Sequence, residues 1–525
     1  MTVLAATLMA AASLGEPMAT PHPNQFRAFL ELLQDQAARA AYPPPAPAQW
    51  GLVPISESNL VYTNTFINAV AAIALTSSGA PKRARAILDV LDRQTDICPG
   101  CGCQGGLQKE RLITGEPDPA AARNDFFVGE NAWLLASARY YQRQTGDERY
   151  ANFILRLEAW LTCLDALPPE PGMPAGYEKD GTLLPPHAEG SIDVVGSLNG
   201  SSRGDVQADV KAWLDREVWV PGGGSCFERG HDNELNLPLD HVSWGVLALP
   251  PAYACLLRHA EALNERAADR HTIELFDREP LQYWIAPPTG AEVGVTTRVH
   301  GQGRDLAVTY QMAAHSFLLL ERDRDLDLPA GPGFSLGFEL EGDGSRRLFD
   351  VKLRNRETNE VYWHQFPLDF TGWKRQQVPY EKFILFSHGP GPGDPAPLGR
   401  VDKIQFGLGT GDQPAAGTFA LGRIEYSSSR APLRPPVVGF SAFQSERNWL
   451  FLEGTAAMAT AYCVSGETAA WSRHLATLRR LTRPARGNLS AWGMPSWFSG
   501  GWWKPEPNAL GTAWILMATS CVDPF

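Results

Sequence analysis

The hydrophobic positions of this chain follow a helical spacing on both sides of a long segment in which they alternate as in strands. Residues 25–41 (QFRAFLELLQDQAARAA) place apolar side chains three and four positions apart, and the Pro-rich stretch after them ends this predicted helix. Residues 277–427 instead carry short alternating runs that are separated by Gly, Pro or Asp turns. The pattern therefore predicts a β-domain that is inserted into a helical one.

Further helices are predicted in pairs joined by short turns. They cover residues 64–77, 81–94, 128–146, 148–164, 189–200, 204–218, a helical stretch at 239–267, and then 448–465, 467–482 and 508–519. Repeated helical hairpins build either a solenoid or a closed double ring of helices. The long, irregular loops between these hairpins favour the closed ring, in which the loops at one end converge on a central cleft.

Within the β-segment the clearest predicted strands are residues 334–342, 348–355, 360–368, 402–409 and 418–427. Antiparallel strands at this spacing form a β-sandwich. The predicted fold class is therefore α+β multidomain: an (α/α) toroid of helical hairpins with an inserted, jelly-roll-like β-sandwich. The predicted divisions are an apolar leader at 1–22, the toroid at 23–276 and 440–525, the sandwich at 277–427 and a linker at 428–439.

Composition narrows the class of ligand. The 525 residues carry a net charge of −12, which argues against a nucleic acid as partner. The 16 Trp and 13 Tyr offer flat faces that can stack on sugar rings, although aromatic side chains also fill protein cores. The predicted partner is a polysaccharide or oligosaccharide, and the oligomeric state stays open.

The leader and the rest of the chain give only a partial prediction of location. The first 20 residues are apolar and Ala-rich but lack the basic start of a signal peptide. Later runs are too short for a membrane helix, so no integral membrane segment is predicted. An extracellular or periplasmic location is expected if the leader is a shortened signal, and a cytoplasmic location remains the alternative.

Cys98, Cys101 and Cys103 cluster as CPGCGC, while the other five cysteines stand singly. Zinc would need a fourth ligand, and the sequence has no second CxxC or CxH pair to supply it. The alternative is a disulfide from the cluster to one of the single cysteines. We predict a structural staple of this loop and no cofactor. The segment 231–234 (HDNE) lacks the HExxH spacing and is predicted to be a solvated loop.

Two acidic residues at one predicted helix start are candidates for acid–base chemistry. Glu189 and Asp193 are four positions apart, so on a helix they share one face. They follow a Pro-Pro-His segment, which places them at the mouth of the helix. Glu189 is the predicted general acid. The alternative is that Glu189 only complements the helix dipole.

Two further acids begin other predicted helices. Asp240 opens the segment LDHVSW, where it is either the partner base or an ordinary N-cap. Glu453 lies in the apolar segment WLFLEGTAAM, where a carboxylate needs a partner or a raised pKa. Glu453 is therefore a catalytic candidate, with a buried structural bond as its alternative.

Aromatic residues are the predicted sugar-binding side chains. The loop 490–507 (SAWGMPSWFSGGWWKPEP) concentrates Trp among Gly and Pro, so it either lines a cleft or packs over one. The candidates for stacking on substrate are Tyr177, Trp244, Trp492, Trp497, Trp502 and Trp503.

The β-segment resembles the carbohydrate-binding family 11 sandwich and its relative, the complex I intermediate-associated protein 30 domain. The resemblance rests on Asp369-Phe370-Thr371-Gly372-Trp373-Lys374, Val378-Pro379, Phe383, Ile404-Gln405-Phe406 and Gly417-Thr418-Phe419. It covers about 150 residues and implies a sugar-binding sandwich. Gly422 and Arg423 stand where that family has an Asp, so a calcium or ligand role there is not implied.

The helical part resembles a bacterial group of (α/α)-toroid proteins that are related in fold to glycoside hydrolases such as family 8. The resemblance rests on residues 68–74, 85–89, 129–133, 176–178, 188–193, 239–244, 453–456, 512–514 and 522–525. The group carries Tyr-Asp where this chain has Phe66 and Ile67, and His-Asn where it has Gly190 and Ser191. If either segment carries chemistry in that group, these departures imply that this chemistry is lost or altered here.

The leading hypothesis is a carbohydrate-active enzyme, a glycoside hydrolase that cleaves within a polysaccharide between paired carboxyl groups. A non-catalytic polysaccharide-binding or assembly protein is the second hypothesis, because the acid at position 67 is missing. A polysaccharide lyase or sugar epimerase on the same toroid is the third.

Overall fold

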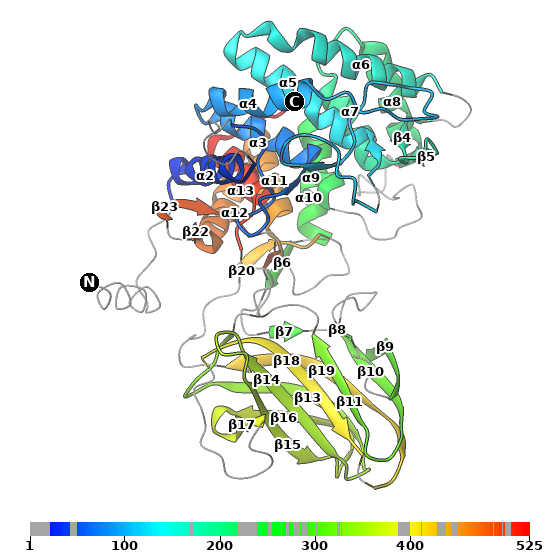
Figure 1. Cartoon of the computed structure of the whole chain (residues 1–525), viewed down its shortest axis with the longest axis vertical. Helices are drawn as coiled ribbons and strands as arrows, with labels where there is room; N and C mark the ends of the chain where they lie inside the picture. Colours follow the sequence, from blue (N-terminus) through cyan, green and yellow to red (C-terminus); the bar gives the residue numbers. More distant parts are fainter. Residues whose placement is uncertain are drawn as a thin grey trace.

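In the computed structural model of the chain, a helical part lies above a β-sandwich, and segments from both ends of the chain build the helical part (Figure 1). The chain is thus an α+β protein with more than one domain. The structure describes residues 21–525 except 42–49, 123, 168–171, 219–238, 250–254, 264, 269–271, 275, 277–283, 286–290, 301–302, 323–325, 327, 387–398, 411, 428–436, 443–449, 487, 496 and 499–505.

The helices before the sandwich agree closely with the predicted ranges up to residue 197. In the predicted helix 204–218, the α-helix ends at Trp213 and one π-helical turn follows. The stretch 239–267 contains two helices and ends in a strand, β6 (Glu265–Ala268). The described helices are α2 (Pro23–Ala41), α3 (Thr65–Ser77), α4 (Pro81–Asp92), α5 (Val128–Thr145), α6 (Ala151–Asp165), α7 (Ala188–Ser197), α8 (Gly204–Trp213), α9 (Leu239–Ala248), α10 (Cys255–Leu263), α11 (Leu452–Val464), α12 (Thr468–Leu481) and α13 (Ala509–Ser520).

Six of these helices contact one another in a closed cycle. α3 packs on α5, α5 on α7, α7 on α9, α9 on α11, α11 on α13, and α13 returns to α3. Each helix that follows a cycle member in the chain, from α4 to α12, packs against the member before it. The cycle crosses from α9 to α11, on opposite sides of the insertion, so neither segment of the helical part is complete without the other.

The members of the cycle are apolar on nearly every side because they are covered by two neighbours and by an outer helix. In α3, small residues such as Ala69, Ala71, Ala72 and Ala74 are fully buried, which lets the adjoining helices approach closely. Residues from α3, α5, α7, α9, α11 and α13 share one hydrophobic core.

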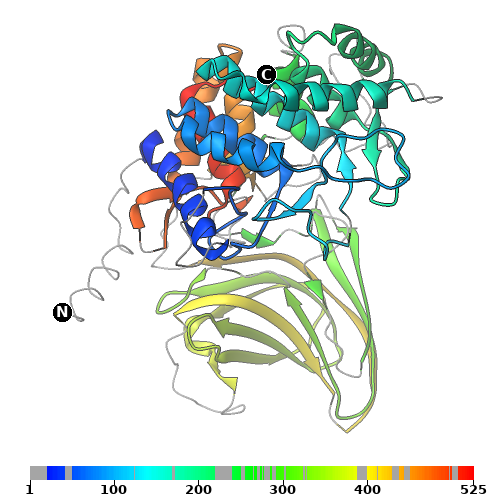
Figure 2. The ribbon, with the colours of Figure 1, turned by 45° about the horizontal axis from the view of Figure 1, so that its top comes forward.

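The β-sandwich consists of two antiparallel sheets that share a second, separate core. One sheet has the order β16-β13-β19-β10-β9 with β7 on β19, and the other has β17-β15-β14-β18-β11-β8 with β12 on β18. Figure 2 shows the two layers facing each other. The strands are β7 (Thr272–Glu274), β8 (Trp284–Ile285), β9 (Glu292–His300), β10 (Gly303–Met312), β11 (Phe317–Arg322), β12 (Leu328–Pro329), β13 (Ser335–Asp343), β14 (Leu348–Asn355), β15 (Val361–Pro367), β16 (Thr371–Pro379), β17 (Ile384–Leu385), β18 (Arg400–Gly409) and β19 (Ala415–Ser427).

The sandwich begins earlier than residue 277. β7 pairs with β19, and Ile273 and Phe276 lie in the core of the sandwich. The helical spacing that continues to residue 267 hides this boundary, because a three-residue strand has too few positions to show alternation.

A small two-stranded sheet connects the two parts. β6 pairs with β20 (Val437–Phe440), and the register runs from Ala268 opposite Val437 to Glu265 opposite Phe440. The Phe440 N–H donates to the hydroxyl of Thr455 on α11 at 3.0 Å, which ties this sheet to the helical part. The end of the predicted linker 428–439 is therefore a paired strand.

The cysteine cluster is covalently linked. Disulfides join Cys98 to Cys101 and Cys103 to Cys163 on α6. The predicted staple from the cluster to a single cysteine is confirmed, and these thiols do not serve as zinc ligands. A further disulfide joins Cys463 on α11 to Cys521 after α13.

Short β-structures lie in the loops that precede the cycle helices. They are β1 (Tyr62–Asn64) with β2 (Glu110–Leu112), the three-stranded sheet β3 (Phe126–Phe127), β4 (Pro174–Tyr177) and β5 (Leu183–Pro186), β21 (Leu450–Phe451) with β24 (Trp497–Phe498), and β22 (Arg483–Ala485) with β23 (Asn488–Gly493). Within the part of the chain that the structure describes, no helix combines the length and apolar character needed to span a membrane.

Candidate functional site

A cavity of about 330 Å³ lies beside the N-termini of α5 and α7. The β3-β4-β5 sheet forms one wall, and the first turns of the two helices form another. The lining residues are Lys109, Phe127, Val128, Gly129, Glu130, Ala175, Leu184, Pro185, Pro186, His187, Glu189 and Gly190.

Four successive helices of the cycle carry an acidic residue in the first turn. These residues are Glu130 on α5, Glu189 on α7, Asp240 on α9 and Glu453 on α11. They are close enough to affect one another: Asp240 and Glu130 both raise the pKa of Glu189, and Glu453 raises that of Asp240. The structure therefore brings together the three first-turn acids that the sequence analysis selected and adds Glu130.

Burial is the main cause of the raised pKa values in this group. It raises the pKa of Glu189 to about 8, with further contributions from Asp240 and Glu130, which Lys109 opposes. Glu189 keeps 38% of its side chain exposed, but it faces the cavity, whose walls replace most of the bulk water. Burial likewise raises the pKa of Glu453 to about 8 and that of Asp240 to about 7.

Lys109 supplies the one cationic side chain among the cavity-lining residues. Its Nζ lies 3.8 Å from Glu130 Oε1 and 5.3 Å from the ring centre of Phe127. Burial raises the pKa of Glu130, and Lys109 partly offsets this effect.

Asp193 lies one turn below Glu189 and does not line the cavity. Its side chain is buried, and its Oδ1 accepts a hydrogen bond from Trp133 Nε1 at 2.9 Å. Because this carboxyl group is covered by α5, it cannot act on substrate directly, and its prediction as a catalytic residue is corrected. Burial, followed by the nearby Glu189, raises its pKa well above the usual range.

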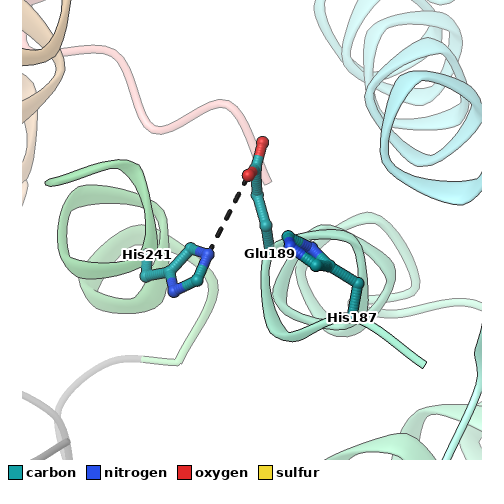
Figure 3. Close-up of side chains that lie close together, drawn as sticks. All are labelled: His187, Glu189 and His241. Carbon is teal, nitrogen blue, oxygen red and sulfur yellow. Dashed lines mark ion pairs between the residues drawn. The ribbon is translucent and has the colours of Figure 1, made fainter. Parts of the chain in front are cut away.

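Two histidines flank Glu189, as Figure 3 shows. His187 immediately precedes α7, and His241 lies in the first turn of α9. His241 Nε2 is 3.9 Å from Glu189 Oε2, and the two imidazole centres are 5.7 Å apart. Burial, with a smaller contribution from His187, lowers the pKa of His241 to about 3, so this ring is neutral at ordinary pH.

An aromatic cluster joins residues of α3, α5 and α9. The rings of Phe66, Trp133 and Trp244 meet edge to face with centroids 5.6 to 5.7 Å apart. Trp244 is only 5% exposed, so the prediction that it stacks on sugar is wrong: its faces contact other aromatic rings. Phe66, which stands where the similar group has Tyr, belongs to this packing.

The other aromatic candidates differ in how far they are buried. Tyr177 is 3% exposed, and its hydroxyl oxygen accepts a hydrogen bond from the Cys103 N–H, so it supports the disulfide loop and cannot stack on substrate. Trp492 is half-buried on β23, where its Nε1 donates to the Leu489 carbonyl.

Trp497 pairs through its backbone with Phe451, directly before α11, and its side chain lies outside the described residues. Trp502 and Trp503 lie outside them entirely, as does the segment 231–234. Their predicted roles remain predictions.

Two glycines let α5 and α7 approach closely at the cavity. A Cβ at Gly190 would lie 2.5 Å from Val128 Cγ1, and a Cβ at Gly129 would lie 2.9 Å from Asp193 Oδ2. A larger residue at position 190 would therefore displace α5. This close packing explains why glycine stands at that position here.

Sequence reasoning missed Glu130, His187 and His241 as site residues. Glu130 carries the same signal as the three acids that were selected, an acidic residue in the first turn of a mostly buried helix. The histidines are within two residues of Glu189 and Asp240 in sequence, but nothing in the spacing shows that the two loops meet.

No protein-family model matches the chain, and no curated protein matches it. Among solved structures, it is similar to a family 11 carbohydrate-binding module from Clostridium thermocellum in complex with a β-1,3-1,4-mixed-linked tetrasaccharide (17% identity, 32% of this chain and 96% of that chain, TM-score 0.24). It is also similar to a sugar epimerase from a ruminal bacterium (12% identity, 45% of this chain and 66% of that chain, TM-score 0.32). A cellobiose 2-epimerase from Bacillus thermoamylovorans gives 11% identity over the same shares, with a TM-score of 0.33.

Proposed function

We propose that the chain is a carbohydrate-active enzyme, a glycoside hydrolase that cleaves a polysaccharide by acid–base catalysis between paired carboxyl groups. The observation that carries this proposal is the convergence of first-turn acids on successive helices of the cycle, next to a cavity that Glu130 and Glu189 line. Hydrolysis of a glycosidic bond needs one carboxylic acid to protonate the leaving oxygen and a second carboxylate to assist attack.

The roles follow from the order of the acids around the ring. Glu189 faces the cavity and is the proposed general acid, and Asp240 on the next helix is its proposed partner base. Glu453 lies on α11, the next helix of the cycle after that of Asp240. It raises the pKa of Asp240 and so changes how readily that group is ionised. Asp193 is proposed as a positioning residue that holds Trp133 against α7.

The fold supports this proposal at a coarser level. We propose that the closed cycle of helices is an (α/α) toroid, since each cycle helix is backed by the helix that follows it. We also propose that the inserted sandwich is jelly-roll-like and binds carbohydrate beside the toroid, on the basis of the family 11 resemblance of residues 369–424.

An oxidising location fits the covalent structure. Three disulfides occur among the described residues, and such bonds persist mainly in secreted or periplasmic proteins. We therefore propose an extracellular or periplasmic protein.

The test is reducing-end release from a panel of neutral and acidic polysaccharides by the purified full chain. We expect Glu189→Gln and Asp240→Asn each to lower kcat by about 10²–10⁴ on any polysaccharide that wild type cleaves. Asp205→Asn is the matched control, because Asp205 is a first-turn acid on the outer helix α8, away from the cavity. Unchanged kcat in both site variants, with cleavage intact, would remove this assignment.

A second candidate is a lyase or epimerase, and the pair His187 and His241 beside Glu189 favours it. Such enzymes move a proton at carbon, which histidine can do as base or acid. Solvent deuterium incorporation at a sugar carbon, or an unsaturated product that absorbs in the ultraviolet, would select this candidate. Glycan binding without any released product would instead favour the non-catalytic polysaccharide-binding or assembly protein.

A further inference from the structure

The side chains of His187, Glu189 and His241 lie close together beside the cavity, which His187 and Glu189 line. His187 comes from the loop between β5 and α7, Glu189 from the first turn of α7, and His241 from the first turn of α9 (Figure 3). One ligand-type atom from each residue lies within 4.8 Å of the other two. This geometry depends on the packing of α7 against α9, which also fixes the two helix starts side by side.

His241 provides an independent indication of a ligand. Its side chain is 4% exposed, yet neither ring nitrogen has a hydrogen-bond partner among the described residues. Buried polar atoms are nearly always satisfied, and an unsatisfied one costs about 1–3 kcal/mol. Its Nε2 points toward Glu189 at 3.9 Å, which is beyond hydrogen-bond distance but allows an ion to lie between the two.

We infer that His187, Glu189 and His241 bind a divalent first-row transition metal ion such as Zn²⁺. Two imidazole nitrogens and one carboxylate oxygen are donors that suit zinc, iron, nickel or copper, whereas calcium and magnesium prefer oxygen donors alone. This inference goes beyond the proposed hydrolase function and does not depend on it.

Only a modest adjustment brings the donors to bonding distance. Zinc bonds to nitrogen and oxygen are about 2.0–2.2 Å long, so tetrahedral ligand atoms lie roughly 3.3 Å apart. The largest separation, 4.8 Å, must shrink by about 1.5 Å. His187 and Glu189 are only partly buried and line the cavity, so their side chains can supply this movement.

The surroundings favour a cation. Glu130 and Asp240 are further acidic groups near Glu189, and Lys109, the lysine that lines the cavity, is already paired with Glu130. A metal ion with three protein ligands keeps an open coordination position, which here faces the cavity. While the ion is bound, Glu189 serves as a ligand and cannot act as a general acid. Metal binding and hydrolysis through Glu189 can therefore be measured separately.

The test measures metal binding directly. Full-length protein, freed of metal by chelation, is titrated with Zn²⁺ by calorimetry, and bound Co²⁺ is followed by its visible absorption. We expect one equivalent to bind and the thermal midpoint to rise with Zn²⁺ concentration. His187→Gln, Glu189→Gln and His241→Gln should each weaken binding by more than the roughly 10–100-fold that loss of a residue supporting a ligand costs.

His474→Gln is the matched control, because His474 is also fully buried on α12 with an unpartnered Nδ1 but lies outside the cluster. It should leave zinc affinity unchanged even if it lowers the thermal midpoint. Glu189→Gln keeps shape and hydrogen-bonding capacity at a partly exposed position, so it tests the site even if His241→Gln fails to fold. Absence of stoichiometric Zn²⁺ or Co²⁺ binding in wild type, or equal affinity in wild type and Glu189→Gln, overturns the inference, whatever the outcome of the hydrolysis assay.

Discussion

Trp133 and Trp244 lie edge to face in the same buried cluster, but they differ in one hydrogen bond. Trp133 donates its indole N–H to Asp193, whereas the indole N–H of Trp244 has no partner among the described residues. Trp133→Phe therefore leaves a buried carboxyl group without its donor, while Trp244→Phe removes similar volume and no hydrogen bond. We expect Trp133→Phe to cost about 1–3 kcal/mol more than Trp244→Phe in free energy of unfolding.

Urea unfolding followed by far-ultraviolet circular dichroism measures this difference without relying on tryptophan emission. Equal losses for the two variants would show that the bond to Asp193 does not stabilise the interior of the ring.

Glu453 makes the stability of the protein depend on pH in a defined direction. Burial raises its pKa from 4.5 to about 8, so between these values the folded state binds a proton that the unfolded state has released. Stability is then fully present below pH 4.5 and falls as pH rises toward 8, by up to about 1.4 kcal/mol per pH unit for one group. We expect Glu453→Gln to lose about 3 kcal/mol less than wild type in free energy of unfolding between pH 5 and pH 8.

Chemical unfolding at several pH values checks this expectation. Glu467→Gln is the control, because Glu467 is an exposed acid before α12. If wild type and Glu453→Gln show the same dependence on pH, Glu453 is ionised in the folded state at neutral pH.

At the residue scale, the sequence indicated which acids lie at helix starts but not which aromatic side chains are buried. An acidic residue in the first turn of an otherwise apolar helix must lie at a helix end that is near the core, which is why Glu189 and Asp240 could be selected. An aromatic side chain carries no such constraint. Tyr177 and Trp244 are as compatible with the core as with a cleft, and both are buried.

At the scale of elements, helices were predictable and their mutual contacts were not. Helices α2 to α6 match their predicted ranges because each is a continuous stretch of helix-forming apolar and polar residues that ends at Pro, Gly or a polar turn. β6 and β7 were missed, since short strands gain their stability from partners far along the chain.

Two of the disulfides allow a comparison of how much a long and a short covalent loop stabilise the helical part. Cys463–Cys521 closes a loop with a sequence separation of 58, from α11 to the residue after α13, whereas Cys98–Cys101 has a separation of 3. Loop-closure entropy predicts a stabilisation of about 4 kcal/mol for the long loop and about 2 kcal/mol for the short one. We expect replacement of both Cys463 and Cys521 by Ser to lower the free energy of unfolding more than the same change at Cys98 and Cys101.

The measurement is denaturant unfolding without reducing agent. A larger loss from the Cys98 and Cys101 replacement would show that the short bridge stabilises its loop through contacts rather than through chain entropy.

At the scale of the whole molecule, the described residues form two separate cores, and the β6–β20 sheet connects the two parts of the chain. The helical core includes Val437 and Phe440 of β20, and the sandwich core begins with Ile273. Separate cores predict that each part folds by itself. The helical cycle nevertheless needs both of its segments, so any cut must preserve the connection between them.

The register of β6 and β20 shows where such a cut can be made. Ala268 and Val437 are antiparallel partners, so residues 269–436 can be replaced by Asn-Gly to form a two-residue hairpin turn. We expect this shortened chain to fold, with a helical thermal midpoint within roughly 5 °C of that of the full chain. It should retain zinc affinity and cleavage of short oligosaccharides, and lose cleavage of insoluble polysaccharide if the sandwich supplies binding.

The control also removes Val437, which shifts the register by one residue and turns Phe440 away from the helical core. If both deletions are equally unstable, folding of the helical part requires the sandwich. The β6–β20 sheet then does more than connect the two parts.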